Sequence, residues 1–371
     1  MRIADVKPFL VDRYLLVRVY TDEGFIGTGE AGLWAHHPTV AAAVRELAAY
    51  CRGKDPRRIE HHAQVITRDT HFSGPVLSAA VSAVDVALWD ILGQAAGLPV
   101  HQLLGGRCRD RVRVFANLGG ATPPERAAAA RALVDEGYTS LRLTPFNPGF
   151  EAHTPARVIA DAVAMVAAVH EAVGDEADLG LEIHRNLRPE EAITLARELE
   201  PYRVLYYEDA LPPESIDALE YVARHVRLPM ASGERYHTLQ QFADLIDRKT
   251  VSLIRPDLSL AGGFTQAKKI AAYAEAHFVG IFPHLMGGPV NNAAFVQLAA
   301  AIPNFVVMEN NPVAGPVADA IRGEPELVDG YRLVPERPGL GIDIDEVALE
   351  GVPCQRHTIT GAFHRDGSVA H

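Results

Sequence analysis

The sequence is poor in cysteine and in positive charge. Its three cysteines, Cys51, Cys108 and Cys354, are too few and too far apart for a disulfide framework or a zinc site. This usage fits a reducing compartment, so we predict a cytoplasmic protein. A net charge of −12 argues against nucleic acid or an anionic membrane as partner, because both favour a basic face. An anionic small-molecule substrate stays compatible, since it needs only local cations.

The sequence also has little that would predict a membrane span or a targeting segment. Residues 1–20 contain no basic segment followed by a long apolar run, so we expect no signal peptide. The most apolar stretch, residues 75–97, carries Asp85 and Asp90 and is interpreted as a buried helix instead of a membrane span. With 48% hydrophobic and 22% charged residues, the 371-residue chain has the composition of an ordinary globular protein.

The opening part of the chain has the pattern of a small α+β domain. Two extended segments, 14–20 and 25–29, flank the turn Thr21-Asp22-Glu23-Gly24, which predicts a β-hairpin. Helical periodicity follows over residues 38–49 and again over roughly 59–94. A hairpin followed by helices favours a compact α+β unit.

From residue 112 onward, short β-branched or apolar runs alternate with Ala-rich helical segments. The candidate strands are residues 112–117, 140–144, 178–183, 203–207, 228–232, 251–256, 280–283 and 305–308. Eight strands separated by helices predict a (β/α) barrel, in which consecutive strand ends meet at one mouth. The tail from about 313 to 371 is rich in proline and glycine without clear periodicity, and we expect it to pack back on the first domain.

Three glutamates close consecutive candidate strands at equal intervals. Glu182, Glu208 and Glu234 are separated by one barrel unit each, since 208 − 182 = 26 and 234 − 208 = 26. Any one of them alone would more simply cap a helix or form an ion pair. All three at matched spacing would converge at the barrel mouth and repel one another unless a cation lay between them. A hard divalent ion, Mg²⁺ above others, is the predicted occupant.

Two histidines join this set. His184 lies two residues beyond Glu182, so both side chains point to the same side of an extended strand. His284 and Asp257 end the seventh and sixth candidate strands, which are neighbours. A carboxylate beside an imidazole fixes its tautomer and raises its basicity, so this pair is a candidate general base. Strands three and seven lie opposite one another, so a bound substrate would have an imidazole on each face.

Several short runs occur in the order found in mandelate racemase-like members of the enolase superfamily. These runs are Thr21-Asp22-Glu23-Gly24, Ala87-Leu88-Trp89-Asp90, Leu104-Gly105-Gly106, Glu182-x-His184, Glu208-Asp209, Gly233-Glu234-Arg235, Arg255-Pro256-Asp257 with Gly262-Gly263, and Pro283-His284. Over about residues 1–312 the chain is similar to this subgroup, and it most closely resembles the galactonate dehydratase branch. Each run is weak alone, whereas their joint order and spacing are highly specific.

The resemblance implies a modified TIM barrel, (β/α)7β, with an α+β capping domain. Residues 1–111 would form the cap, residues 112–312 the barrel, and residues 313–371 a C-terminal segment that returns to the cap. One Mg²⁺ per active site, bound by the three glutamates, is implied as well. A cytoplasmic enzyme of carbohydrate catabolism, assembled as a homo-oligomer from dimer to octamer, is the corresponding expectation.

The resemblance also implies roles for individual residues. His284, paired with Asp257, would abstract the proton alpha to the carboxylate, and His184 would protonate the departing hydroxyl. Glu309, at the end of the eighth strand, matches the carboxyl group that contacts the substrate carboxylate. Removing a proton alpha to a carboxylate builds a dianionic enolate, so a metal must take up charge while a base takes the proton.

The substrate-binding candidates are Trp34, His36 and His37 in a loop of the cap, and Arg142, Thr144 and Arg235 at the barrel mouth. Several positions depart from the usual pattern of the subgroup, among them Ala210, where relatives tend to have proline two residues after the second metal ligand. Glu182 stands where relatives usually have Asp. The run Arg142-x-Thr144 replaces Lys-x-Lys, which argues against a lysine-based racemase. The loop 33–37 also differs from the galactonate enzymes, which leaves the identity of the sugar acid open.

Three functions are compatible with these residues. The first is Mg²⁺-dependent dehydration of an aldonate or aldarate to the 2-keto-3-deoxy acid, a hydro-lyase reaction. The second is epimerisation, racemisation or cycloisomerisation of a sugar acid through the same enolate. The third is a barrel that binds metal and sugar acid without turnover. The complete set of carboxylates and histidines favours an enzyme, and the partner in each case is a small acid sugar.

Overall fold

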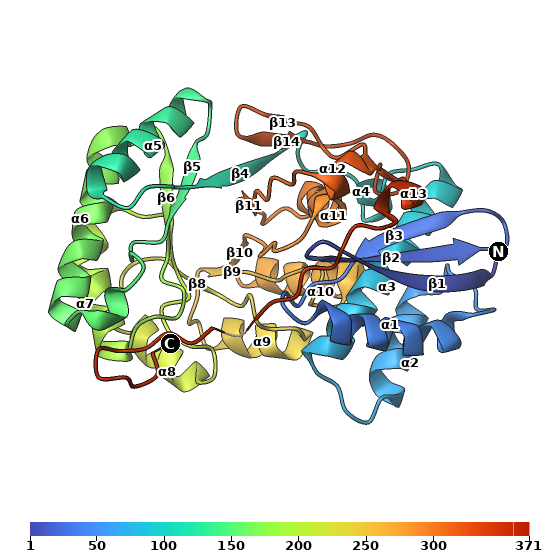
Figure 1. Cartoon of the computed structure of the whole chain (residues 1–371), viewed down its shortest axis with the longest axis horizontal. Helices are drawn as coiled ribbons and strands as arrows, with labels where there is room; N and C mark the ends of the chain where they lie inside the picture. Colours follow the sequence, from blue (N-terminus) through green and yellow to red (C-terminus); the bar gives the residue numbers. More distant parts are fainter. Residues whose placement is uncertain (359, 371) are drawn as a thin grey trace.

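The structure is a computed structural model that describes residues 1–358 and 360–370. The chain opens with a three-stranded antiparallel sheet of β1 (Ile3–Val11), β2 (Tyr14–Thr21) and β3 (Ile26–Glu30). The helices that follow it are α1 (His37–Cys51), α2 (Ile59–Asp69) and α3 (Pro75–Ala96). Together they form the α+β cap, on the right of Figure 1.

Two details of the cap differ from the sequence-based expectation. The helical stretch expected over 59–94 is two helices, because α3 begins at Pro75, whose ring disfavours helical backbone at the preceding Gly74. Strand β1 had not been predicted. Its residues pair with β2 along its whole length, although only three of the nine are fully buried, so it lacks a strong apolar signal.

Helix α3 is the core of the cap. A Cβ at Gly29 of β3 would lie 1.9 Å from the carbonyl oxygen of Ala83, so only glycine allows the helix to lie this close to the sheet. Within the described chain, α3 is the one helix long and apolar enough to cross a membrane by length and composition. Because 72% of its most apolar window is buried inside the protein, its hydrophobicity is accounted for by packing.

The barrel alternates eight parallel strands with seven helices in the described chain. The strands are β4 (Arg111–Asn117), β5 (Ser140–Leu143), β6 (Asp178–Glu182), β7 (Tyr206–Glu208), β8 (Met230–Ser232), β9 (Leu253–Ile254), β10 (Gly280–Ile281) and β11 (Met308–Glu309). The helices are α5 (Pro123–Asp135), α6 (Pro155–Val173), α7 (Pro189–Leu199), α8 (Ile216–Ala223), α9 (Leu239–Asp247), α10 (Gly263–Ala276) and α11 (Pro289–Ala301). Short helical turns occur at α4 (Val100–Leu103), η1 (Phe150–Ala152) and η2 (Glu200–Tyr202).

The strands close into a ring. Their order runs β10-β9-β8-β7-β6-β5-β4, strand β11 pairs with β4, and a bridge between Ile281 and Phe305 joins the two ends. This is the predicted (β/α)7β barrel with its cap, and the fold prediction is confirmed. All eight candidate strands overlap observed ones. Several observed strands are shorter than the predicted ones, as at Leu253–Ile254. The run of buried residues there is longer than the stretch that forms strand hydrogen bonds, so the sequence pattern overestimated the strand.

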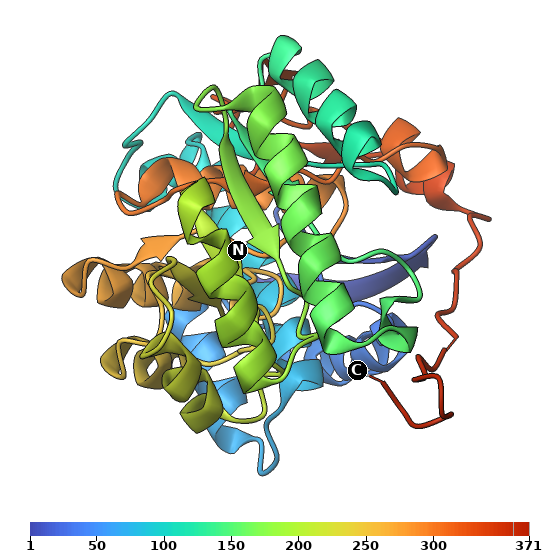
Figure 2. The same cartoon turned by 90° about the vertical axis from the view of Figure 1, so that its left-hand side faces the viewer.

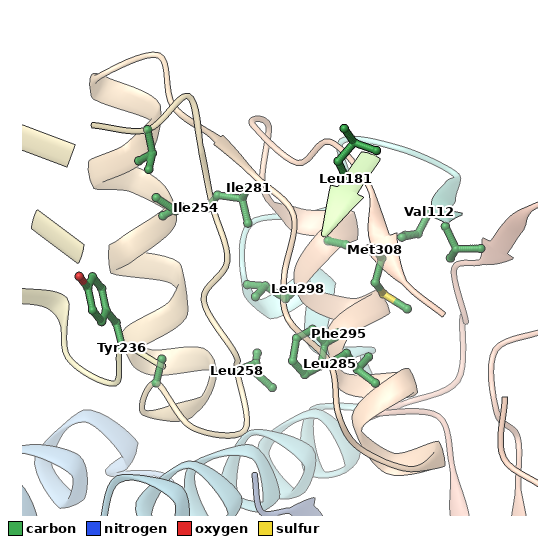
Figure 3. Packing of buried hydrophobic residues seen from close by; sticks show 14 of the residues in the cluster. Val112, Leu181, Tyr236, Ile254, Leu258, Ile281, Leu285, Phe295, Leu298 and Met308 are labelled. Atoms are coloured by element: carbon green, nitrogen blue, oxygen red, sulfur yellow. The ribbon is translucent and has the colours of Figure 1, made fainter. Parts of the chain in front are cut away.

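The barrel has an outer and an inner core. Between strands and helices, residues such as Leu181 and Met308 pack with Phe295 and Leu298 of α11 in one large cluster (Figure 3). The inner cluster consists of Phe115, Tyr206, Ala231, Leu253, Phe282 and Val307. Tyr206 stacks on Phe282 with ring centroids 4.3 Å apart. A Cβ at Gly180 would lie 2.1 Å from the Tyr206 ring, so glycine makes room for this apolar floor.

The segment after residue 312 is more ordered than its sequence indicated. It forms α12 (Pro316–Asp319), β12 (Ile321–Arg322), β13 (Leu327–Val328), β14 (Tyr331–Leu333), β15 (Asp343–Ile344) and α13 (Glu346–Leu349). Strand β14 pairs antiparallel with β4 and so extends the barrel sheet. The segment also contacts the cap, because Tyr20 donates a 2.7 Å hydrogen bond to Glu346 and Arg18 lies 3.0 Å from the same carboxylate. The domain boundaries at 111 and 312 remain predictions.

Candidate active site

The three predicted metal ligands come together at the mouth of the barrel. In the parallel ladder of β6 and β7, Glu182 lies opposite Glu208, and Glu234 follows the end of β8 by two residues. Each side chain offers an oxygen, and these oxygens lie within 4.8 Å of one another. Among the described residues this is the one such group of His, Cys, Asp and Glu side chains.

Burying three carboxylates side by side costs free energy unless positive charge lies nearby. Glu208 is fully buried, and neither of its oxygens has a geometrically satisfactory hydrogen bond. Burial raises the pKa of Glu208 well above its ordinary value, and the nearby Glu182 adds to this effect. The mouth holds six carboxylates, Glu182, Glu208, Asp209, Glu234, Asp257 and Glu309, and three guanidinium groups, Arg142, Arg185 and Arg255. Carboxyl groups still outnumber guanidinium groups when the half-exposed Arg235 is added, and their clustered oxygens are the ligands that a hard divalent cation prefers.

Arg255 is a functional candidate that the sequence reasoning missed. Its side chain is 0% exposed, lies over the ring of Phe282, and pairs with Glu208. Its Nη1 atom is 2.8 Å from Glu234 Oε2, and Nη2 is 3.0 Å from Glu309 Oε2. A signal was available, because a cation two residues before Asp257 on a barrel strand must share its side of the strand.

Arg185 was missed as well. Its Nη1 atom pairs with Glu234 and lies 3.2 Å from Asp209 Oδ2, while Nη2 is 2.8 Å from Nε2 of His184. The sequence carried no strand-based signal for it, because β6 ends at Glu182 and Arg185 lies in the following turn with a φ of 66°. Asp209 is itself held by the hydroxyl of Ser232, which donates a 2.7 Å hydrogen bond.

His284 lies beside a carboxylate, as the sequence predicted. Its Nδ1 atom is 2.8 Å from Asp257 Oδ2, and the other Asp257 oxygen accepts a 2.8 Å hydrogen bond from the backbone N–H of Ser259. The second ring nitrogen is 3.7 Å from Glu234 Oε2. Although burial opposes it, the charges of Glu234 and Asp257 raise the pKa of His284. The carboxylate therefore fixes the ring and leaves Nε2 directed to the glutamate cluster.

His184 also reaches this cluster, but from a turn instead of the strand. Its φ is 56°, and its backbone N–H donates a 2.7 Å hydrogen bond to Glu182 Oε1. Burial, and then the charge of Arg185, lower the pKa of His184. Because a guanidinium only donates, Nε2 accepts from Arg185 and the ring proton lies on Nδ1.

A cavity of about 990 Å³ joins these groups. The predicted site residues that line it are Trp34, His36, Arg142, Thr144, Glu182, His184, Glu234, Arg235, Asp257, His284 and Glu309. Arg142 donates a 2.8 Å hydrogen bond to Glu309. Glu208 lies buried below the cavity, and His37 lies beyond its wall, in a second hollow of about 510 Å³. Arg235 is half-exposed and 3.8 Å from Glu214.

A capped (β/α)7β barrel whose strand ends present carboxylates and imidazoles to one cavity is the scaffold of a metal-assisted acid–base enzyme. The N-terminal domain of the mandelate racemase / muconate lactonizing enzyme family matches residues 7–105. The enolase C-terminal domain-like family matches residues 125–348. The chain therefore belongs to the mandelate racemase / muconate lactonizing enzyme family of the enolase superfamily, and this confirms the predicted membership.

Full-length relatives agree with this membership. The chain is 36% identical over 373 residues to a D-galactonate dehydratase of Ralstonia pickettii, with 97% of each chain covered. It is 35% identical to a D-galactonate dehydratase of Pectobacterium atrosepticum, with 93% of each covered. A crystal structure of an enolase from Agrobacterium radiobacter, provisionally a galactarate dehydratase and bound to Na and L-malate, superposes with a TM-score of 0.93 at 29% identity over both full chains. The crystal structure of a mandelate racemase / muconate lactonizing enzyme from Jannaschia sp. CCS1 superposes with a TM-score of 0.88 at 31% identity. The match covers 97% of this chain and 99% of that chain.

Proposed function

We propose that this protein is a Mg²⁺-dependent sugar-acid dehydratase that converts an aldonate or aldarate into its 2-keto-3-deoxy acid. The observation that carries the proposal is one cavity lined by the His284–Asp257 pair, by His184, and by carboxylates of the glutamate cluster. D-galactonate dehydratases at 35–36% identity over nearly the whole length support the same reaction.

The metal would be held by Glu182, Glu208 and Glu234, whose oxygens lie within 4.8 Å of one another. When bound, a divalent ion takes up charge that develops on the substrate carboxylate as the alpha proton leaves. Glu208 is the member whose buried oxygens most need a cation. Glu182 carries one more methylene than the Asp that the resemblance leads us to expect there, and Nη1 of Arg142 lies 3.5 Å from its Oε2 atom.

The two histidines would divide the proton transfers. His284 takes the alpha proton at Nε2, because Asp257 occupies Nδ1 and holds the ring. The electrons of the broken Cα–H bond first pass into the carboxylate group as an enolate, and they form the Cα–Cβ double bond when the Cβ–O bond breaks. His184 gives a proton to the departing hydroxyl, which leaves as water. The enol then becomes the 2-keto acid, so a proton gained at His284 balances the proton lost at His184.

Substrate binding would use the remaining groups of the cavity. Although burial opposes it, Arg142 and Arg255 lower the pKa of Glu309. We propose that Glu309 contacts the substrate carboxylate together with Arg142, to which it is hydrogen-bonded and whose positive charge offsets the repulsion between the two carboxyl groups. Thr144, Arg235, Trp34 and His36 are proposed contacts for the hydroxyl chain, and His37 would support the Trp34 loop from outside the cavity.

The test is a screen of purified protein with Mg²⁺ against aldonic, aldaric and uronic acids, with D-galactonate first, detecting keto-acid formation. Product from any member supports the proposal. Solvent deuterium uptake at the alpha carbon without keto acid would instead favour epimerisation or cycloisomerisation, which two opposed histidines also permit. Neither product nor exchange with any acid would leave a barrel that binds without turnover. Sizing of the same preparation tests the proposed homo-oligomer, and a reporter fusion tests the cytoplasmic location.

A further inference from the structure

Trp34 forms a wall between two hollows. It lines the active-site cavity on one side and, on the other, the second hollow of about 510 Å³ that also contains His37. The indole is 47% exposed. Its neighbours Leu33 and Ala35 have φ values of 66° and 71°, a left-handed conformation that non-glycine residues adopt only when other contacts hold it. The position of this wall therefore depends on what packs behind it.

The C-terminal segment packs behind it. Asp12, in the turn between β1 and β2, donates its N–H to the carbonyl of Pro353 at 3.1 Å and accepts a 2.7 Å hydrogen bond from the N–H of Gln355. These two bonds fix the segment beside the cap. Two residues further on, the ring of His357 lies against the indole of Trp34, with ring centroids 4.5 Å apart and planes inclined by 54°. The outer face of the wall is thus covered by the tail.

The same segment continues to the barrel. Nδ1 of His364 is 3.0 Å from the carbonyl oxygen of Glu151, in the loop that follows β5. His364 also lines a small hollow with Asn186 and Leu187, which come directly after the turn that carries His184. In Figures 1 and 2 the tail, in dark red, runs outside the molecule from the cap to the barrel. Its attachments at the two domains limit how far His357 can move away from Trp34.

We propose that His357 is a positioning residue for substrate binding, which holds Trp34 in place as the outer wall of the sugar-acid site. This inference rests on the proposed function. An indole face is a suitable surface for the C–H face of an acyclic polyhydroxy acid. Without His357 the indole can turn into the second hollow, and the substrate chain loses the surface against which it packs. The metal ligands and the two catalytic histidines lie on the barrel and would be unaffected.

The kinetic test uses His357→Ala, His357→Phe and a chain ending at Val352, with the sugar acid identified by the screen. His357→Ala and the shortened chain should raise KM about fivefold with kcat within about twofold, as expected for loss of one aromatic contact. His357→Phe should restore KM, because it keeps a ring against the indole. His225→Ala is the matched control: His225 follows the end of α8, outside the cavity, and its ring lies 4.6 Å from that of Tyr221 with planes inclined by 48°, so KM should not change.

A second readout does not depend on turnover. Subtracting the emission of Trp34→Phe from that of the parent isolates Trp34 without altering Trp89, the other tryptophan. His357→Ala should shift this difference spectrum to the red and increase its quenching by acrylamide. An unchanged spectrum, or a red shift with unchanged KM, would overturn the proposal. If the parent has no dehydratase activity, the proposed function fails, and the emission change still decides whether the tail holds Trp34.

Discussion

Two groups of buried carboxylates in the described part of the chain have different partners. At the junction of cap and barrel, Glu30 accepts hydrogen bonds of 2.5 and 3.0 Å from the N–H groups of Gly288 and Asn291, at the start of α11. Asp85 of α3 accepts a 3.2 Å hydrogen bond from Thr265, at the start of α10. These carboxylates are bound by neutral backbone donors at helix N-termini, which favour negative charge.

The mouth carboxylates have charged partners instead. Glu234 is held by two guanidinium groups, those of Arg185 and Arg255, and Glu309 by those of Arg142 and Arg255. Burial raises the pKa of Asp85 to about 7, and burial also raises the pKa of Glu208. A shifted pKa therefore does not distinguish the junction from the mouth. What separates them is an excess of negative charge beside a cavity, and this difference distinguishes a site from a structural clamp.

The sharpest way to break this comparison is to remove the charge of one proposed metal ligand at the mouth without changing the shape of its side chain. Glu208→Gln should abolish Mg²⁺ binding and lower kcat by at least about 10³-fold, because the amide cannot supply the charge that holds a hard cation. EDTA should have the same effect on the unchanged protein, and Mg²⁺ should restore it. Calorimetric titration with Mg²⁺ and keto-acid assays measure both.

The matched control for this variant comes from the junction. Glu30→Gln also replaces a buried glutamate by its amide, but it should leave Mg²⁺ affinity unchanged, because Glu30 is bound by backbone N–H groups of α11 and does not line the cavity. Full activity of metal-free protein, or equal loss of metal affinity in both variants, would contradict the distinction between the two places.

A smaller loss should separate the two histidines. If His284 is the base, His284→Asn should lose dehydration and alpha-proton exchange alike, each by about 10²–10⁴-fold, because no other group takes the proton. If His184 is the acid, His184→Asn should lose dehydration while exchange survives. Proton NMR of the substrate in deuterium oxide measures both rates. Exchange that persists in His284→Asn and vanishes in His184→Asn would reverse the roles.

This experiment needs one further measurement. His184 donates its backbone N–H to Glu182 and lies beside Arg185, so its replacement can disturb the metal ligands. Mg²⁺ affinity of His184→Asn, measured by titration, shows whether a loss of exchange reflects the metal or the proton donor. A variant that binds Mg²⁺ normally and exchanges the alpha proton, but forms no keto acid, is the expected result.

The mouth was easier to predict from sequence than the junction for a physical reason. Barrel strands place their last residues side by side whatever their sequence separation, so the equal spacing of Glu182, Glu208 and Glu234 was sufficient to group them. The partner of Asp85 is the start of α10, about 180 residues away, and no periodicity links the two. Asp85 could be recognised as an unusual residue within an apolar helix, but not as a cap for another helix.

The arginines and the tail show a second limit. Arg185 lies in a left-handed turn, where no alternating pattern indicates the direction of its side chain. Arg255 shares its side of the strand with Asp257, but the carboxylates that it reaches depend on the apolar floor on which it lies. The segment after residue 312 lacks periodicity because its strands are only two or three residues long, and one of them, β14, pairs with the distant strand β4. Short elements of this kind depend on tertiary contacts more than on propensity.

The smallest expected effect concerns Asp85 at the junction, where we expect the free energy of unfolding to depend on pH. Burial raises the folded-state pKa of Asp85 to about 7, above its ordinary value of 3.8, and hydrogen bonds from Thr265 and Phe264 only partly offset this. A group with a raised folded-state pKa stabilises the fold fully at a pH below its unfolded pKa, and this contribution is lost as pH rises through 7.

Asp85→Asn keeps the accepting oxygen and has no such titration. The free energy of unfolding of the parent minus that of Asp85→Asn should therefore fall by about 2 kcal/mol between pH 5 and pH 8. Urea denaturation at several pH values measures it, and the titration of the mouth cancels because both proteins carry the same mouth. Asp110→Asn, at a side chain that is 89% exposed, should show no such trend. A difference that is constant or rises with pH would mean that Asp85 stays charged in the fold, stabilised by the start of α10 as the mouth carboxylates are by their cations.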